Sequence, residues 1–230
     1  MAVLSGRLPE IAEQIAACRR CPRLVQWREE VGRVRRAAYR NQSYWSRPVA
    51  GFGDPAARLL LIGLAPGAHG ANRTGRPFTG DASGRFLYPA LYRCGLSNRA
   101  ESLHPGDGLE LRGIWITSAV RCVPPGNLPT REELANCADW TVQELADLPI
   151  RVFLALGQIA HDALLAYLGL RPSQHRFGHG QRWSLSENRW LVDSYHVSAR
   201  NTQTGRLTAP MFDALLSQAV HLADLDPPEP

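Results

Sequence analysis

The stretch RLLLIGLAPGAHGANRTGRPFTGDASG, residues 58–84, decides the fold because it joins a short apolar run to a long loop rich in glycine. The run RLLLI is typical of a buried strand, and residues 63–84 behind it contain six glycines and two prolines. We expect a strand over 58–65 and, after the loop, a helix over 84–94. Glycine lets the backbone approach a ligand closely, so this loop is a candidate binding element.

The rest of the chain repeats the alternation of strand and helix. Further strands are expected at 113–120, 150–156 and 190–196, and helices at 8–17, 130–148, 158–168 and 208–225. Thr130 and Glu133 have the spacing of a capping box, which marks a helix start. The alternation predicts an α/β fold in a single domain: a central parallel four-stranded sheet flanked by helices.

Ligands of such sheets bind at the carboxyl ends of the strands. Three loops are expected at that edge, at 63–84, 121–129 and 196–206. We assign residues 1–225 to the domain, with the N-terminal helix and the cysteine-bearing segment over 8–47 included, and we expect the tail DPPEP at 226–230 to be disordered.

The composition points to a globular protein with a positive charge. The 230 residues are 44% hydrophobic and contain no apolar run near the length of a membrane span, so we expect a soluble cytoplasmic protein. The formal net charge is +5, and residues 19–47 hold nine arginines against two glutamates. A basic segment suggests a polyanionic partner, although a moderate positive charge also occurs in proteins that touch no nucleic acid.

Four cysteines in two pairs suggest a metal site. Cys18 and Cys21 form C-x-x-C, and Cys122 and Cys137 follow much later, while Cys94 lies apart in a predicted helix and is expected in the core. Disulfides are disfavoured inside cells. A structural zinc, an iron-sulfur cluster and four unrelated buried thiols all remain open from the spacing alone.

The glycine-rich loop is neither a GxGxxG fingerprint nor a Walker A loop. Together with SYHVSARNTQTG at 194–205 and the two cysteine pairs, it resembles the type B, or fifth, family of uracil-DNA glycosylases over about residues 18–212. The resemblance implies a parallel sheet with flanking helices and the excision of deaminated bases from DNA. It also implies a structural 4Fe-4S cluster on Cys18, Cys21, Cys122 and Cys137.

A glycosylase extrudes its target nucleotide into a pocket, where an aromatic ring stacks on the base. The resemblance makes Phe78 the stacking residue, although Phe78 taken alone reads as a core side chain. His69 taken alone reads as a turn residue that bonds nearby backbone. The residues expected at the base or the adjoining DNA are Gly63, Ala65, Gly67, Ala68, His69, Phe78, Ser118, Ser198, Arg200 and Asn201. Arg73, Arg76 and Arg206 are further candidates for phosphate contact, or else solvated surface charges.

Cleavage of the N-glycosidic bond places negative charge on the departing base, so a donor at a base oxygen stabilises the transition state. The resemblance assigns this role to His196. Most uracil glycosylases orient the water with a carboxylate or Asn in the first motif, but here Leu64 and Ala65 stand there, as is typical of type B. The resemblance places Asn127 at the water, while Asp81 either assists the water or the sugar cation or simply caps a helix.

Ser118 in ITSAV occupies the position where the related fourth family carries Asn in ITNVV. Ser is too short to pair with the edge of uracil as an Asn amide does, so we expect a permissive pocket that also accepts hypoxanthine or xanthine. Two non-catalytic alternatives remain: an iron-sulfur electron carrier and a zinc-bearing nucleic-acid-binding module. For the glycosylase we expect a monomer acting on DNA, without a membrane.

Overall fold

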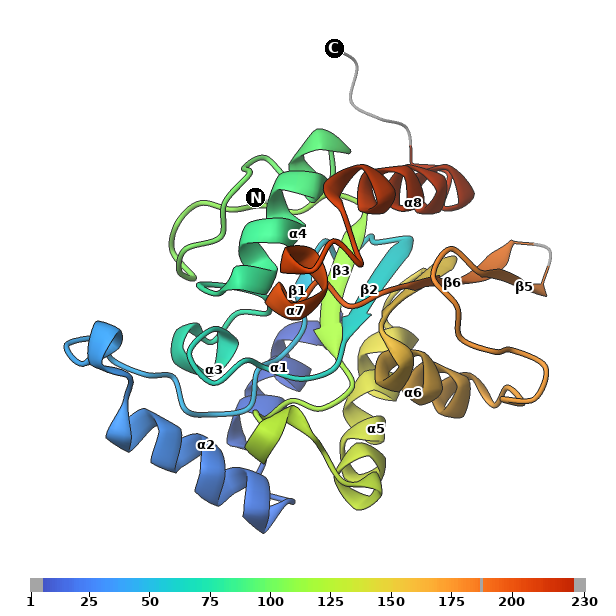
Figure 1. Ribbon diagram of the computed structural model, residues 1–230. Helices are drawn as coiled ribbons and strands as arrows, with labels where there is room; N and C mark the ends of the chain where they lie inside the picture. Colours follow the sequence, from blue (N-terminus) through green and yellow to red (C-terminus); the bar gives the residue numbers. More distant parts are fainter. Residues whose placement is uncertain (1–5, 187, 226–230) are drawn as a thin grey trace.

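A computed structural model describes residues 6–186 and 188–225 of the chain, so the tail expected to be disordered at 226–230 lies outside the described residues. Its centre is a six-stranded sheet in the order β1-β3-β2-β4-β6-β5 (Figure 1). The strands are β1 (Phe52–Gly53), β2 (Leu59–Gly63), β3 (Ile114–Ser118), β4 (Val152–Leu156), β5 (Arg182–Ser186) and β6 (Arg189–Ser194).

Helices surround the sheet and fill most of its connections. They are α1 (Leu8–Ala17), α2 (Pro22–Val34), α3 (Ala71–Thr74), α4 (Ala82–Arg93), α5 (Arg131–Ala146), α6 (Gln158–Leu168), α7 (Ala199–Gln203) and α8 (Ala209–Leu222), with short 3-10 turns η1 (Ala37–Tyr39) and η2 (Pro125–Asn127). The predicted capping box of α5 is present, with Thr130 and Glu133 each bonded to the other's backbone N–H.

Alternate residues of the central strands point to opposite faces of the sheet. Leu59 and Leu61 of β2 belong to a core with α4 and α8, whereas Leu60 and Ile62 belong to a second core with α6 and the region of α5. Every residue of β2, β3 and β4 is buried. These strands therefore need an unbroken apolar run, which is the pattern that identified them in the sequence.

The prediction of a four-stranded parallel sheet is wrong, because it misses one antiparallel strand at each edge. The four predicted strands, β3, β2, β4 and β6, do pair in parallel, but β1 joins β3 and β5 joins β6 in antiparallel pairing, which makes a mixed sheet of six. β1 has only two residues, and β5 is exposed at every second position. Neither edge strand is covered on both faces, so neither carries the long apolar run that marks a central strand.

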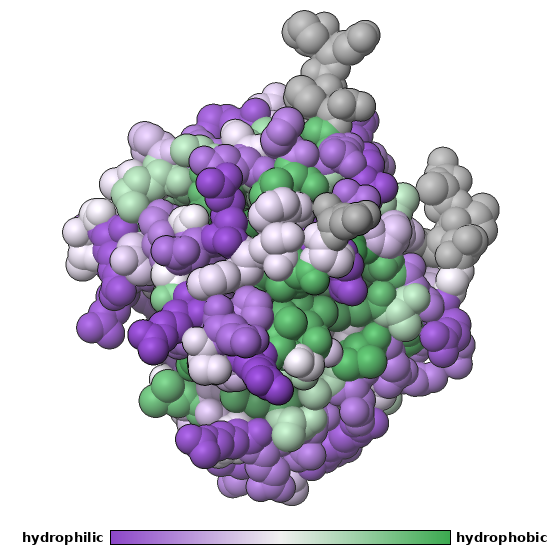
Figure 2. Space-filling model, turned by 90° about the vertical axis from the view of Figure 1, so that its right-hand side faces the viewer, coloured by the Kyte–Doolittle hydropathy of each residue, from purple (hydrophilic) through white to green (hydrophobic). Residues whose placement is uncertain are grey.

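The side of the molecule that carries α6 and β5 exposes apolar surface among hydrophilic residues (Figure 2). Half-buried side chains of these elements, including Tyr167, Leu168 and Trp183, pack against the second core from outside. No helix in the described ranges is long and apolar enough to cross a membrane.

Candidate active site

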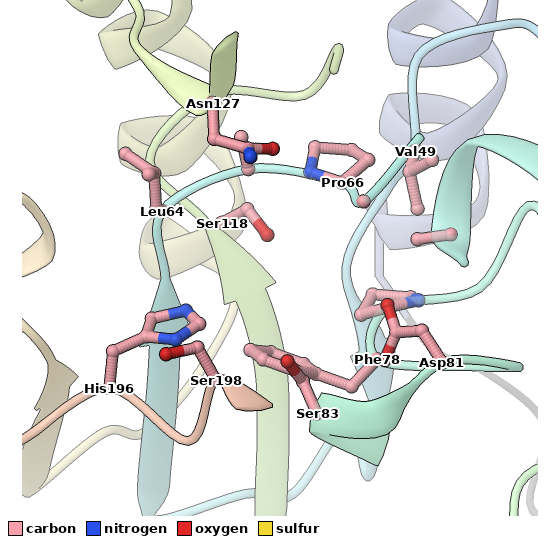
Figure 3. A pocket seen from close by; sticks show the side chains of 14 residues that line it. Val49, Leu64, Pro66, Phe78, Asp81, Ser83, Ser118, Asn127, His196 and Ser198 are labelled. Atoms are coloured by element: carbon pink, nitrogen blue, oxygen red, sulfur yellow. The ribbon is translucent and has the colours of Figure 1, made fainter. Parts of the chain in front are cut away.

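A cavity of about 360 Å³ opens at the carboxyl ends of β2 and β3, where the three predicted loops meet (Figure 3). In Figure 3, Asn127 lies on one side of this cavity, His196, Ser198 and Phe78 lie on the other, and Ser118 lies between them. The lining residues are Val49, Leu64, Ala65, Pro66, Gly67, Ala71, Pro77, Phe78, Asp81, Ser83, Ser118, Asn127, His196 and Ser198.

Phe78 is held in a conformation that few residues of its type adopt. Its φ of 50° lies in the left-handed region, which strains the backbone of a bulky residue. The ring lies over Gly63, where an added Cβ would come within 2.6 Å of the ring atom Cζ. It also stands 6.3 Å from the His196 ring, centre to centre. Strain at a binding residue is consistent with a ring fixed for a ligand rather than one placed for core packing.

Asp81 caps a helix and also lines the cavity. Its side chain caps α4 by accepting the backbone N–H of Gly84 at 3.0 Å, and it also lines the cavity. The other carboxylate oxygen packs against the backbone of Gly67 and Gly70, where a Cβ would collide with it. Burial raises the pKa of Asp81 above its ordinary value, although the capping bonds oppose this shift.

His196 follows β6 and faces the cavity with no fixed partner for its ring. Neither ring nitrogen has a hydrogen-bond partner within the described residues, while its backbone carbonyl accepts the side-chain amide of Asn201 at 2.7 Å. Burial lowers the pKa of His196 to about 4. The imidazole is therefore neutral at physiological pH and keeps one free N–H donor.

Asn127 ends the short turn η2 and is exposed at the rim of the cavity. Its own φ of 58° and that of Gly126, 62°, both lie in the left-handed region. Asn and Gly tolerate this region better than other residues, so the dipeptide suits a tight turn that presents the amide to the cavity.

Some predicted base-pocket residues lie beside the cavity rather than on its wall. Gly63 lies beneath the Phe78 ring, and Asn201 fixes the His196 carbonyl. His69 bonds the Tyr44 hydroxyl at 2.9 Å through Nδ1. Ala68 and Arg200 are also absent from the lining, and Arg200 is exposed in the first turn of α7.

Arg73 and Arg76 of the glycine-rich loop make hydrogen bonds within the protein. Arg76 is buried and binds Asp107 with two bonds of 3.0 and 2.6 Å, so it is neither a phosphate contact nor a solvated charge. The sequence did not reveal that Arg76 is buried, because its partner Asp107 is 31 positions away in the chain. Arg73 donates to the carbonyls of His69 and Gly80 at 2.8 and 3.0 Å and thereby closes the loop.

Sequence reasoning missed several wall residues. Val49, Pro66, Ala71, Pro77 and Ser83 line the cavity without having been predicted there. Four of these five belong to the glycine-rich loop. The sequence had marked this whole loop as a binding element, so these four residues could have been predicted from it. Val49 precedes β1 and reaches the wall because its N–H donates to the Arg121 carbonyl at 2.8 Å. This contact joins segments far apart in the chain, so no local sequence pattern predicts it.

The four predicted ligand cysteines come together from different elements. Cys18 follows α1, Cys21 precedes α2, Cys122 lies in the loop after β3, and Cys137 lies in α5; all four line one small cavity. Burial raises the pKa of the Cys122 thiol to about 12. Bound metal favours the thiolate and reverses such a shift. Cys94 is half-buried at the edge of the first core, away from this cavity.

The surroundings of the thiols fit an anionic group. Arg28, only 2% exposed, donates to Cys122 Sγ at 3.0 Å, and its Nε has no partner. Asn136 donates to Cys21 Sγ at 3.7 Å. A buried guanidinium needs a negative partner, and hydrogen bonds to sulfur are usual around iron-sulfur clusters. No three His, Cys, Asp or Glu side chains in the described ranges are grouped to hold a single metal ion.

Comparison with known proteins places the chain in a family. The model of the uracil DNA glycosylase superfamily matches residues 50–219. A type-5 uracil-DNA glycosylase of Thermus thermophilus is 62% identical over 93% of this chain and 97% of its own length. The chain belongs to the type-5 uracil-DNA glycosylases.

More distant relatives fit the same placement. A type-5 enzyme of Mycobacterium leprae is 47% identical over 96% of this chain and 98% of its own length. A type-4 uracil-DNA glycosylase of Pyrobaculum aerophilum is 35% identical over only 57% of this chain and 60% of its own length. The family resemblance read from the two loop motifs is confirmed, together with the enzyme class, a hydrolase of N-glycosyl bonds, and the single-domain α/β fold of the superfamily.

Proposed function

We propose that the protein flips uracil out of DNA and hydrolyses its N-glycosidic bond, leaving an abasic site without cutting the strand. The observation that carries the proposal is the cavity at the strand edge, where Phe78, His196 and Asn127 meet from three separate loops. Membership of the type-5 family supports the same reaction. We propose that the protein carries out this reaction as a monomer.

The extruded base stacks on Phe78 in this proposal. The ring is aromatic, faces the cavity and is fixed by Gly63 beneath it. Stacking on a side chain recovers part of the energy lost when a base leaves the duplex. The strained backbone of Phe78 holds the ring ready before DNA arrives, which reduces the cost of ordering it on binding.

His196 donates its N–H to a uracil oxygen as the bond to the sugar breaks. Negative charge then develops on the departing base, and a fixed donor stabilises that charge more in the transition state than in the bound substrate. The neutral state of the ring follows from burial, which lowers its pKa to about 4. Asn201 supports this arrangement because it holds the His196 backbone.

Asn127 and Asp81 are assigned to the water and the sugar. Asn127 carries both an acceptor and donors at the rim, which suits a polar group that orients a water molecule. Asp81 lines the opposite part of the cavity, and its ionised form offsets positive charge on the sugar. Because burial raises the pKa of Asp81, this contribution weakens as the pH falls.

We further propose that the pocket accepts other deaminated bases, including hypoxanthine or xanthine. Ser118 supports this, because it lines the cavity at the end of β3 with a side chain too short to pair with a base edge. A site without paired polar groups leaves nothing unsatisfied when the base changes, so it discriminates weakly.

We also propose that Cys18, Cys21, Cys122 and Cys137 hold a structural 4Fe-4S cluster. The four thiols around one cavity, the donors to sulfur and the orphaned Nε of Arg28 support an anionic metal-thiolate group. Bound there, the cluster would join α1, α2 and α5 to the loop that leads to Asn127 and would contribute folding energy.

The decisive experiment is single-turnover excision from oligonucleotides that contain one uracil, as single strands and as duplexes. Alkali-labile abasic sites should form, and intact strands should persist without alkali. Binding without any abasic product would contradict the proposal and favour a non-catalytic nucleic-acid-binding protein. Iron and acid-labile sulfide near four atoms each per chain would support the cluster, whereas stoichiometric zinc would contradict it.

A further inference from the structure

The segment between α2 and β1 carries a dense positive charge. Residues 31–53 contain five arginines and neither Asp nor Glu. Arg33 pairs with Glu30 on the surface of α2. The other four, which lie within residues 35–47, have no acidic partner in the described part of the chain and are all exposed: Arg35, Arg36, Arg40 and Arg47. We call residues 35–47 the arginine segment.

Some exposed arginines elsewhere in the described ranges have an acidic partner and others, including Arg85 and Arg206, do not, so the arginine segment differs in the density of its unpaired charges. Arg19 pairs with Glu29, Arg20 with Asp139, and Arg93 with Asp213. Four unpaired charges within thirteen residues are a large part of a net charge of +5. Such a concentration of like charge is unfavourable in the free protein and is relieved by an anionic partner.

The arginine segment is bound to the loop that lines the cavity. Backbone N–H groups of Trp45 and Ser46 donate to the carbonyls of Arg73 and Asn72 at 2.9 and 3.0 Å. The Tyr44 hydroxyl bonds His69 at 2.9 Å, and Arg73 donates to Gln42 at 2.7 Å. These bonds fix residues 42–46 against the glycine-rich loop, beside the cavity rather than on its wall.

Two of these arginines belong to backbone positions near the cavity or near the glycine-rich loop, and the Nε of Arg47 donates to the Ala16 carbonyl at 3.2 Å. Arg47 is two positions before Val49, which lines the cavity, so their Cα atoms are at most about 7 Å apart. The positive charge of Arg36 contributes to lowering the pKa of His69 in the glycine-rich loop. In Figure 1, the segment lies beside α3, and α3 lies between it and α7, the helix that carries Arg200 on the other side.

We propose that Arg36, Arg40 and Arg47 bind phosphates of the uracil-bearing strand next to the flipped nucleotide. This inference rests on the proposed function. A nucleotide inside the cavity remains linked to its own strand, so the neighbouring phosphates must cross the rim. Exposed guanidinium groups on a fixed support bind phosphate oxygens with directed, charge-assisted hydrogen bonds.

The test is the salt dependence of binding by the variant Arg36→Gln/Arg40→Gln. The probe is an oligonucleotide with a tetrahydrofuran abasic-site analogue, used single-stranded and as a duplex over a range of salt concentrations. If each arginine contacts one phosphate, the slope of log affinity against log salt should fall by about 1.8 for the duplex and about 1.4 for the single strand. Arg47→Gln alone should lower each slope by about half as much.

The matched control is Arg33→Gln/Arg93→Gln, which removes the same two charges from exposed positions that are paired with Glu30 and Asp213. It should keep the wild-type slopes. Unchanged slopes in the test variants, or an equal fall in the control, would overturn the inference. A fall confined to the duplex would overturn the assignment to the uracil-bearing strand. Wild-type protein that binds but does not excise uracil would instead contradict the proposed function.

Discussion

At the scale of single residues, two cavity side chains are central to the proposed reaction: His196 and Ser118. The His196 ring has no hydrogen-bond partner within the described residues, and Ser118 lines the cavity with a short side chain. The surrounding fold determines what each side chain can do. Burial keeps the His196 ring neutral, and the short side chain of Ser118 leaves space in the cavity.

His196→Ala should reduce single-turnover excision of uracil by about two to three orders of magnitude, the usual loss of one fixed donor in the transition state. Affinity for abasic DNA should persist. His196→Asn, which restores an N–H donor, should recover part of the rate. A loss of DNA affinity with intact chemistry would show that His196 is a DNA contact instead.

The pH profile provides a second check on His196. Because burial lowers the folded-state pKa to about 4, the ring stays neutral from about pH 5 upward, and the rate should show no inflection at the ordinary histidine pKa of about 6.5. A rate that rose as the pH fell through 6.5 would mean that the charged imidazolium is the donor.

Ser118→Asn should raise the ratio of uracil excision to hypoxanthine or xanthine excision by about tenfold or more, because the new amide pairs with uracil and is left unsatisfied by a base with the wrong edge. The measurement is single-turnover excision from matched duplexes that carry each base. Wild-type protein active on uracil but inactive on both purines would contradict this account of Ser118.

At the scale of secondary-structure elements, the start of α4 shapes the base pocket. Asp81 caps the helix, and Gly84 in its first turn lets the Phe78 carbonyl come close, since a Cβ there would overlap the carbonyl oxygen. The helix start and the strained aromatic residue are therefore parts of one arrangement.

Gly84→Ala should lower both stability and excision, although Ala at an ordinary helix position stabilises by up to about 1 kcal/mol relative to Gly. The added methyl must displace the Phe78 backbone and with it the stacking ring. Thermal unfolding and single-turnover excision measure the two effects. A stabilised variant with the wild-type rate would show that the Phe78 carbonyl has room to move.

The proposed cluster would connect the elements that carry Cys18, Cys21, Cys122 and Cys137. Cys137→Ala should lower iron content, solubility and the thermal midpoint, because α5 would lose its link to α1 and α2. Cys94→Ala is the matched control, since Cys94 lies at the edge of the first core, away from the cysteine cavity. Full iron content in Cys137→Ala would show that the ligand assignment is wrong.

At the scale of the whole molecule, a buried ion pair ties the sheet to its surroundings. Glu144 of α5 binds Arg121 at 2.7 Å, the Thr117 hydroxyl of β3 at 2.9 Å and the N–H of Gly51 at 2.9 Å. Both charged side chains are almost completely buried. The pair therefore joins a helix, a strand and the segment that leads to the cavity wall at Val49.

Glu144→Gln should reduce the free energy of unfolding by about 3–5 kcal/mol, because Arg121 would keep a buried charge without a counter-ion. Asp213→Asn, which breaks the exposed pair with Arg93, should cost at most about 1 kcal/mol. Urea unfolding with equal slopes measures both changes. Similar losses for the two variants would contradict the role given to burial.

The sequence by itself determined the central strands, the capped helices and the family. Residues 59–63 and 152–156 are buried on both faces, so their apolar runs are visible without any tertiary information. Thr130 and Glu133 form a local capping box that depends only on residues three positions apart. Phe78, Asn127 and His196 were found because their motifs resemble those of the family.

Only the tertiary structure decided what lies at the edges and which charges are buried. β1 and β5 are edge strands whose pairing depends on neighbours rather than on an apolar run. Arg76 was expected to be a phosphate contact or a solvated charge, but it is buried against Asp107. Arg28, for which the sequence made no prediction, is buried and donates to Cys122 Sγ. The edge strands and the buried arginines share one physical reason. Contacts between segments far apart in the chain determine burial and charge pairing, and local sequence patterns do not predict such contacts.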